Sequence, residues 1–276
     1  MTYILTMILV GIFAGIVGAV LGLGGGIVIT PVLTLIFQIE IKYAIGAAII
    51  AVLATSSGSA IAYLKDDMLN LRVAMFLEIF TTLGAFIGAM LSLVSDAKFL
   101  FILYGLLLTF QAYNMYQKLR SKTDSYVAAV PDKISEKLQL NSSYYDQSSG
   151  KTVEYQVTNV PAGSAIMFVA GILSALLGIG SGAFKVLAMD TVMKMPLKPS
   201  SATANFMMGV TATASAIFYF FSGQIDPLLA APIAVGVVIG SMIGSKLMPR
   251  IPVPILRVIF IVVLLVSGIQ MFLKGL

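Results

Sequence analysis

Two ionisable side chains that could do chemistry, Lys185 and Glu78, lie inside long apolar runs of this sequence. If such runs cross a membrane, an ammonium group there is costly and usually functional, so Lys185 could add positive charge to an anion site. A carboxylate in the same medium could carry a proton, which makes Glu78 the candidate coupling residue. Structural alternatives stay open: Lys185 could pair with Glu78 or Asp190 or reach the membrane surface, and Glu78 could hold an ion pair or a hydrogen bond.

Two glycine clusters interrupt apolar runs and are candidates for substrate binding. Their sequences are Gly-Leu-Gly-Gly-Gly at 22–26 and Gly-Ile-Gly-Ser-Gly at 178–182. Lipid cannot satisfy the backbone N–H groups that such breaks expose, so each break must be buried in protein or line a wet cavity. The helix that restarts after each break has a positive N-terminal end, which favours an anion. The predicted ligands are Gly24, Gly25, Gly26, Gly180, Ser181 and Gly182. Alternatively, the glycines only allow close helix packing, as Gly84 and Gly88 do.

A second group of candidate ligands consists of hydroxyl and amide side chains at equivalent places in two apolar segments. Its members are Thr55, Ser56, Thr203, Asn205 and Thr211. Such groups could donate hydrogen bonds to sulfonate or carboxylate oxygens. Isolated Ser and Thr residues in membrane helices more often bond to their own backbone, so the clustering of these residues is what favours a binding role.

Composition identifies an integral membrane protein. Hydrophobic residues make up 59% of the chain and charged residues 11%, with a mean hydropathy of +1.00, whereas about a quarter of a soluble domain is charged. The sequence has no Cys and no His, which excludes disulfides, thiolate chemistry and Cys/His metal sites. We therefore predict no cofactor, no metal and no enzymatic activity. The net charge of +5 comes from cations at the ends of apolar runs, so the expected partner is the lipid bilayer rather than nucleic acid.

The positions of these residues follow an internal duplication with a constant offset of 156 residues. Identical pairs include Gly15/Gly171, Gly22/Gly178, Lys42/Lys198, Thr55/Thr211 and Tyr63/Tyr219. We divide the chain into a membrane repeat at 1–120, a polar connector at 121–160 and a second membrane repeat at 161–276. The connector could form a small hairpin near 152–157, where polar and apolar residues alternate, or a partly disordered linker.

Each repeat contains three clear apolar spans and one longer run that the glycine cluster breaks. The spans lie at 42–64, 73–95, 99–117, 200–221, 227–248 and 255–273, and the broken runs at 3–37 and 161–195. A broken run is too long for one crossing at about 1.5 Å per residue. If it crosses once, the two repeats are parallel; if it turns back, they are inverted.

The distribution of Lys and Arg favours the inverted arrangement. With re-entrant runs, thirteen cations lie on the connector side and three on the other, whereas the parallel arrangement gives little asymmetry. We therefore predict an all-α polytopic membrane protein with two inverted repeats, each a broken, re-entrant helix plus three transmembrane helices. It would lie in the plasma membrane with the connector cytoplasmic and both termini outside.

The glycine signatures at 15–31 and 171–189 give the sequence a likeness to a known family. The second half also contains the stretch at 185–190 and the run Ala-Thr-Ala-Asn-Phe-Met-Met-Gly-Val-Thr-Ala at 202–212. In these segments the chain resembles the sulfite exporter TauE/SafE family of membrane transporters, and the resemblance covers nearly everything except the connector. It implies a transporter of sulfite, sulfonates, related sulfur oxyanions or organic acids. Leu187 and Ala204 depart from the proline and serine that the family pattern suggests, and Ala204 removes a hydroxyl that could serve as a ligand.

These observations predict a secondary transporter that moves a small anion by alternating access, with proton coupling through Glu78. Sulfite or an organosulfonate is the expected substrate. Alternatives are a passive anion channel of the same architecture and a transporter for small carboxylates. A structural membrane subunit would leave the glycine clusters without a ligand. The sequence leaves open whether the protein forms a homo-oligomer.

Overall fold

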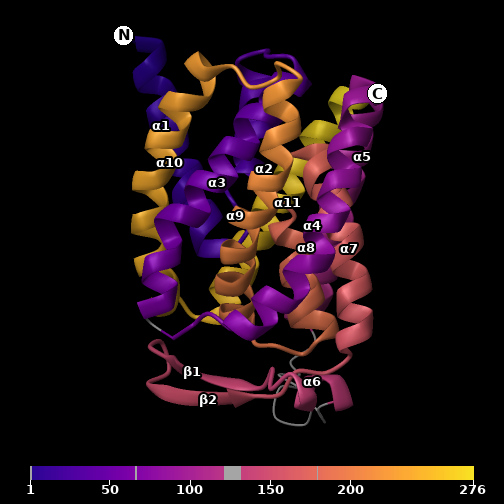
Figure 1. Ribbon diagram of the computed structural model, residues 1–276. Coiled ribbons are helices and arrows are strands. Elements are labelled where there is room, and N and C mark those ends of the chain that lie inside the picture. The colour runs from indigo at the N-terminus through magenta and orange to yellow at the C-terminus, as the bar shows by residue number, and fades with distance from the viewer. Residues whose placement is uncertain (1, 66, 121–131, 179) are drawn as a thin grey trace.

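The computed structural model describes residues 2–65, 67–120, 132–178 and 180–276 (Figure 1). Within these ranges, eight helices are long and apolar enough to cross a membrane, which confirms the predicted all-α polytopic class. They are α1 (Thr2–Leu21), α3 (Ile41–Lys65), α4 (Leu71–Val94), α5 (Ala97–Arg120), α7 (Val160–Leu177), α9 (Leu197–Phe221), α10 (Pro227–Leu247) and α11 (Val253–Gly275). Helix α11 follows α10 through the short 3₁₀ turn η3 (Met248–Arg250).

Both broken runs turn back at their glycine clusters. After α1, the chain continues as the short helix α2 (Gly26–Pro31) and the π-helical turn η1 (Val32–Ile36). The ring of Phe37, just beyond η1, packs edge-on against Tyr3 with 6.1 Å between the ring centroids, so the end of the run lies beside its start. The second run repeats this path through α7, α8 (Gly182–Leu187) and η2 (Ala188–Val192), and the Thr158 N–H donates to the Met193 carbonyl at 3.1 Å. Each run is therefore a helical hairpin.

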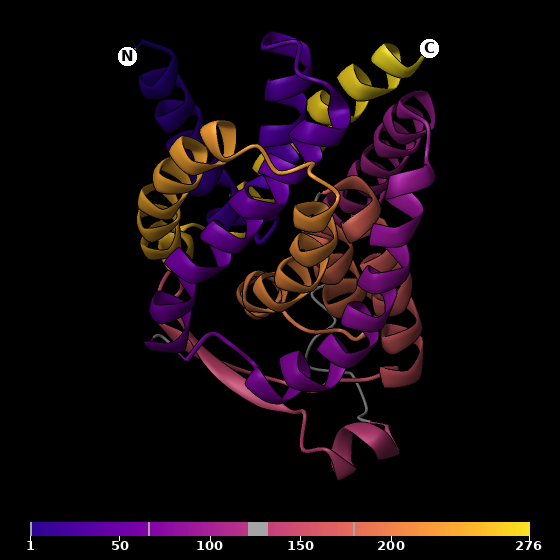
Figure 2. The same ribbon diagram turned by 45° about the horizontal axis from the view of Figure 1, so that its top comes forward.

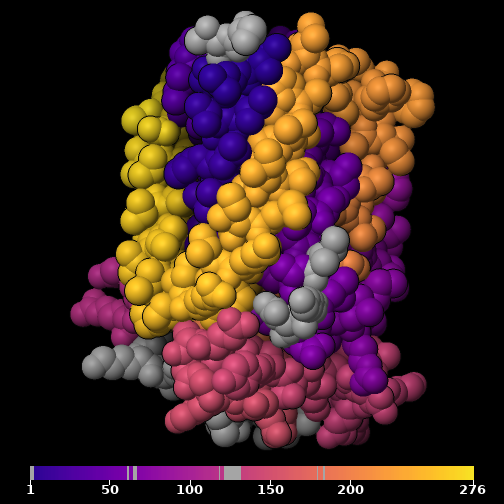
Figure 3. Space-filling model, turned by 90° about the vertical axis from the view of Figure 1, so that its left-hand side faces the viewer, coloured from indigo at the N-terminus to yellow at the C-terminus, as the bar shows by residue number. Residues whose placement is uncertain are grey.

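The first arm of each hairpin is much longer than the return arm. Helices α1 and α7 reach the length and apolarity of a crossing, whereas the return arm at Gly26–Ile36 is short. The physical reason is that the first arm packs along a full-length neighbour, α1 on α10 and α7 on α4. Figure 3 shows α10 running obliquely across the molecule beside α1.

The two long contacts use equivalent residues. A Cβ atom on Gly15 would lie 2.4 Å from the carbonyl oxygen of Val237, and one on Gly171 would lie 2.1 Å from the carbonyl oxygen of Thr81. In each case the first helix of one half packs on the third long helix of the other, as a twofold relation between the halves requires. Both chain ends also lie at the end of the molecule opposite the connector (Figures 1 and 2). The inverted repeat and the three-part division of the chain stay predictions.

The described part of the connector is folded. Helix α6 (Lys133–Lys137) precedes an antiparallel hairpin of β1 (Ser142–Asp146) and β2 (Lys151–Tyr155), in which Ser142 pairs with Tyr155. Of the two alternatives for the connector, the hairpin is therefore present, and its second strand overlaps the predicted segment at 152–155. The hairpin lies across one end of the helices in Figure 2.

Polar contacts attach this hairpin to both halves. Lys198 Nζ, at the start of α9, donates to Asp146 Oδ1 of β1 at 2.5 Å, and Asn70 Nδ2, which precedes α4, donates to the Tyr155 hydroxyl of β2 at 3.1 Å. Burial alone would raise the pKa of the Asp146 carboxyl, but hydrogen bonds from Lys198, Ser148 and Ser149 outweigh burial and hold this pKa below its ordinary value.

Candidate functional site

The two glycine breaks meet in the core between α3 and α9. We call residues 22–25 the first glycine loop and residues 178–181 the second; Ile179 lies outside the described residues. A Cβ atom on Gly26 would lie 2.5 Å from the Gly178 carbonyl oxygen, and one on Gly182 would lie 2.4 Å from the Gly22 carbonyl oxygen. The loops therefore touch each other through their backbones, which only glycine at these contacts permits.

The same two side chains pack against both loops. Gly24 has φ +70° and Gly180 has φ +77°, and the Cβ direction of each points at Val52 of α3 and Met208 of α9. Val52 and Met208 occupy equivalent positions in the two repeats. The left-handed conformation favours glycine at both loop positions.

The first loop is closed by a threonine. The Gly25 N–H donates to Thr55 Oγ1 at 3.0 Å, and the Thr55 hydroxyl donates back to the Ala51 carbonyl of its own helix at 2.8 Å. Both groups are buried. Two predicted ligands, Gly25 and Thr55, thus bond each other within the protein. No charged residue follows the first loop in α2 or η1.

The second loop is followed by a buried charge cluster that the first loop lacks. Lys185 Nζ donates to Thr211 Oγ1 at 2.6 Å and lies 3.3 Å from Glu78 Oε2. Thr211 Oγ1 in turn donates to Glu78 Oε1 at 2.5 Å, and the Thr82 hydroxyl also bonds Oε1 at 3.1 Å. The Lys185 side chain is 0% exposed and that of Glu78 9%. Of the structural alternatives for Lys185, the pair with Glu78 is present, and full burial excludes a reach to the surface.

Three predicted ligands lie apart from this cluster. Ser56 donates to the Phe206 carbonyl at 3.3 Å, and Thr203 accepts the Asn70 N–H at 3.1 Å near the connector. Asn205 Nδ2 donates to the Ala19 carbonyl at 3.0 Å at the end of α1. These contacts join helices, and a ligand role for these residues stays a prediction.

The tyrosine pair of the repeat has a role that sequence reasoning missed. Tyr63 OH donates to the Ala19 carbonyl at 2.6 Å, and Tyr219 OH donates to the equivalent Ala175 carbonyl at 2.8 Å. Both tyrosines are fully buried. They donate to carbonyls in the last turns of α1 and α7, where helical backbone bonding runs out before the glycine loops. Their identity at the 156-residue offset was the available signal.

A second buried ion pair was also missed. Arg257 Nη2 of α11 lies 3.8 Å from Asp190 Oδ1 of η2, and both side chains are almost completely buried. Asp190, one of the alternative partners for Lys185, thus pairs with Arg257. The pairing joins the end of the second hairpin to α11.

The loop residue Ser181 has a hydroxyl without an internal use. Its Oγ is buried and makes no hydrogen bond with the described residues, and its backbone φ is +52°. Ser181, Lys185 and Thr211 are all 0% exposed, so the cluster is closed to solvent in this structure. Within the described ranges, no three His, Cys, Asp or Glu side chains gather closely enough to hold a metal ion.

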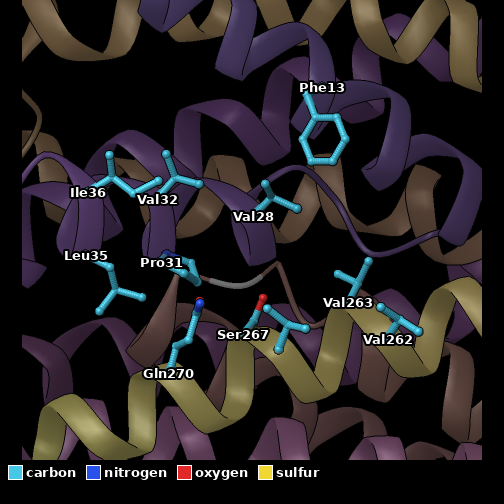
Figure 4. A pocket seen from close by; sticks show the side chains of 11 residues that line it. Phe13, Val28, Pro31, Val32, Leu35, Ile36, Val262, Val263, Ser267 and Gln270 are labelled. Atoms are coloured by element: carbon cyan, nitrogen blue, oxygen red, sulfur yellow. The ribbon is translucent and has the colours of Figure 1, made fainter.

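A separate groove opens on the outer face of the bundle between α1, the α2–η1 arm and α11 (Figure 4). Its volume is about 280 Å³, and its wall is apolar except for Ser267 and Gln270. Phe13, Ile36 and Val262 on its rim are exposed on the bundle surface. None of the predicted ligands lines it, and its apolar wall does not suit an anion.

Comparison with known proteins places almost the whole chain in one group. A family model described as "Sulfite exporter TauE/SafE" matches residues 7–271. The probable membrane transporter proteins YunE and YdhB of Bacillus subtilis (strain 168) are each 26% identical to the chain, over 92% and 83% of its length and 91% and 84% of theirs. A probable membrane transporter protein of Xylella fastidiosa (strain 9a5c) is 26% identical over 82% of the chain and 78% of its own length. No solved structure matches.

Proposed function

Because the chain belongs to the sulfite exporter TauE/SafE family, we propose that it moves a small sulfur oxyanion, sulfite or an organosulfonate, across the membrane by alternating access. The protein is a multi-pass membrane transporter and not an enzyme. The substrate class follows the family description, and the site supports it through the chemistry of its buried groups.

The observation that carries the proposal is the fully buried ammonium of Lys185 beside two glycine loops in contact. An ammonium group in a membrane interior is costly unless it has a partner or a function. Charge-assisted hydrogen bonds are the strong bonds by which proteins hold oxyanions, and Lys185 can donate three. The free hydroxyl of Ser181 and the hydroxyl of Thr211 add neutral donors for the remaining oxygens.

Closure of the site supports a carrier over a passive channel. Lys185, Ser181 and Thr211 are shielded from solvent, so an anion reaches them only if the helical hairpins move against α3 and α9. In transporters built from broken helices, such a site is exposed to one side of the membrane at a time. A channel of the same architecture requires a continuous wet path past the loops.

We propose an orientation with the connector cytoplasmic and the termini outside, as the cation distribution favours. The chain has no cysteine, so any introduced cysteine is unique. Lys194→Cys should be labelled from the connector side and Ser222→Cys from the opposite side. Labelling of Lys194→Cys from the side opposite the connector would contradict the inverted arrangement.

The function is tested with purified protein in liposomes. Saturable uptake and exchange of labelled sulfite, methanesulfonate and thiosulfate are measured beside acetate and chloride, with Arg72→Gln as a charge-removing control at the exposed connector end. The proposal expects saturable transport of at least one sulfur oxyanion and its loss in Lys185→Gln. Equal, non-saturable flux of all anions would indicate a channel, preference for acetate a carboxylate carrier, and absence of flux and binding a structural subunit.

A further inference from the structure

The charge cluster behind the second glycine loop carries an inference about coupling that rests on the proposed function. We infer that the Glu78 carboxylate and the substrate compete for the Lys185 ammonium. A monovalent oxyanion takes the place of Glu78 beside Lys185 only when the Glu78 carboxylate takes up one proton. Anion and proton then move together, one for one, and the loaded site carries the same net charge as the empty one.

The geometry fits such an exchange. Lys185 Nζ lies 2.6 Å from Thr211 Oγ1 but 3.3 Å from Glu78 Oε2, so the ammonium is held firmly by the hydroxyl and more loosely by the carboxylate. The Glu78 carboxylate has further donors in Thr211 and Thr82, both on Oε1. A protonated Glu78 can keep these two contacts while Lys185 turns to another anion. The Thr211 hydroxyl stays beside Lys185 in either state.

Among the described residues of the elements packed against it, Glu78 faces one cation, and no other charge there could balance an added anion. Helix α8 supplies Lys185, and α7 (Val160–Leu177) contains no titratable residue. The titratable residues of α9 are Lys198, which bonds Asp146 in the connector, and Tyr219, whose hydroxyl bonds Ser92 and Ala175. On α4 itself, Arg72 bonds the Gln139 carbonyl at the connector end. The Lys185–Glu78 pair is therefore the local charge balance.

The net charge of this buried site determines how many protons bind with each anion. With both side chains ionised the pair is neutral, and a bound monoanion would leave one uncompensated negative charge in a low-dielectric interior, which is strongly unfavourable. One proton on the Glu78 carboxylate restores neutrality while the Lys185 ammonium keeps its charge for the anion. A dianion such as sulfate would need a second proton, for which this cluster has no second carboxylate.

The first half of the molecule has no equivalent charge pair, so we expect one anion and one proton to bind in each transport cycle. The positions equivalent to Lys185 and Glu78 are Ile29 and Ala234, and the threonine equivalent to Thr211 already bonds the first loop. The first loop therefore has no charge pair to exchange. Transport of a monoanion with one proton moves no net charge across the membrane.

A proton gradient and a membrane potential, applied separately, distinguish this electroneutral mechanism from one that carries net charge across the membrane. The probe is methanesulfonate, which stays a monoanion between pH 5 and 8, so any pH dependence belongs to the protein. In liposomes, an inward proton gradient should drive accumulation of methanesulfonate, whereas a potassium diffusion potential without a pH gradient should not. Accumulation driven by the potential alone would overturn the inference, and so would methanesulfonate transport that ignores the pH gradient.

Binding measurements test the role of Glu78 directly. When one proton enters with each anion, the Kd of the wild-type protein for methanesulfonate should rise about tenfold per pH unit on the alkaline side. Glu78→Gln keeps the shape and hydrogen bonds of the protonated acid, so its Kd should be nearly independent of pH. Asp190→Asn is the matched control, because Asp190 is another buried carboxylate in an ion pair, and it should keep the wild-type slope.

Because Glu78→Gln leaves a buried ammonium without its partner and could fail to fold, the wild-type protein supplies a second readout. A pH indicator should register uptake of close to one proton per methanesulfonate bound in weak buffer. Binding without proton uptake, or sulfate binding as tight as that of methanesulfonate, would overturn the inference. Sulfite transport without methanesulfonate binding would overturn it too while leaving the proposed function intact, whereas absence of transport of every sulfur oxyanion would remove both.

Discussion

The two glycine loops share a backbone path but differ in the polar groups around them. In the first loop, Thr55 accepts the N–H of Gly25. In the second, the equivalent Thr211 bonds Lys185 and Glu78 instead. The two loops therefore have similar backbones, but Lys185 and Glu78 are replaced by Ile29 and Ala234 at the equivalent positions, which leaves only the second loop with a charge pair. Under the proposed function, we expect the first loop to support the packing of the site and the second loop to hold the substrate.

The largest expected effect comes from removing the Lys185 ammonium, the charge that the first loop lacks. Lys185→Ile gives the second loop the residue that the first loop has at position 29. A charge-assisted hydrogen bond contributes roughly 1.5–3 kcal/mol, so anion affinity should fall about tenfold to a hundredfold or more. Isothermal titration with methanesulfonate or sulfite measures the change. Ile29→Val, the matched control, should leave affinity within about twofold of wild type, and equal losses in both variants would contradict the assignment of roles.

The loop glycines give the next largest effect. A Cβ at Gly180 would lie 2.7 Å from Val52 Cγ1, and one at Gly24 would lie 3.1 Å from Met208 Sδ, with positive φ at both positions. Alanine in this conformation costs about 1–2 kcal/mol, so both Gly24→Ala and Gly180→Ala should lower thermal stability. Only Gly180→Ala should also weaken anion binding in the folded fraction. Unchanged affinity in folded Gly180→Ala protein would make the second loop a packing element like the first.

The equivalent threonines Thr55 and Thr211 should affect different properties, protein stability for Thr55 and anion affinity for Thr211. Thr55→Val removes the acceptor of a buried N–H, and leaving such a group unsatisfied costs about 1–3 kcal/mol. This variant should therefore lose stability and keep its anion affinity. Thr211→Val should lower affinity several-fold, because Lys185 loses its closest hydrogen bond. Paired melting and binding curves separate the two cases, and a binding defect confined to Thr55→Val would reverse the assignment.

The smallest expected effect concerns the equivalent lysines at the two ends of the molecule. Lys42 Nζ donates to the Leu93 carbonyl at 3.4 Å, and Lys198 Nζ donates to the equivalent Pro249 carbonyl at 2.9 Å. Only Lys198 also bonds Asp146 in the connector. Because the pKa of Asp146 is lowered in the folded protein, its contribution to docking is complete above its ordinary pKa of 3.8 and is lost as the pH falls through the folded value.

Proteolysis of the connector can report this docking. Asp146→Asn should be cut faster than wild type at neutral pH, and the difference should shrink as the pH is lowered below about 4. Lys42→Ala should not change cleavage of the connector, because its contacts lie in the first half. A difference between Asp146→Asn and wild type that grows towards acid pH would show that the carboxylate does not hold the hairpin.

Much of the fold and part of the site could be predicted from residue types and spacing alone. Apolar run lengths predicted the long helices, the glycine clusters predicted breaks, and Lys185 and Glu78 stood out because ionised groups in apolar segments need a reason. Ser56, Thr203 and Asn205 were grouped with the site by depth. Depth does not tell which helix face a side chain occupies, and in the structure these three residues bond groups of other segments, apart from the Lys185 cluster.

The sequence by itself therefore determined an all-α polytopic membrane protein with a duplicated glycine break, because hydrophobicity, helix length and backbone freedom are local properties of the chain. Only the tertiary structure decided which groups meet. The contact of Lys185 with Glu78 spans 107 residues, and whether a threonine bonds a loop N–H or an ammonium depends on how two repeats pack against each other. Repeats of equal sequence pattern can carry different chemistry because each loop is completed by side chains from distant helices.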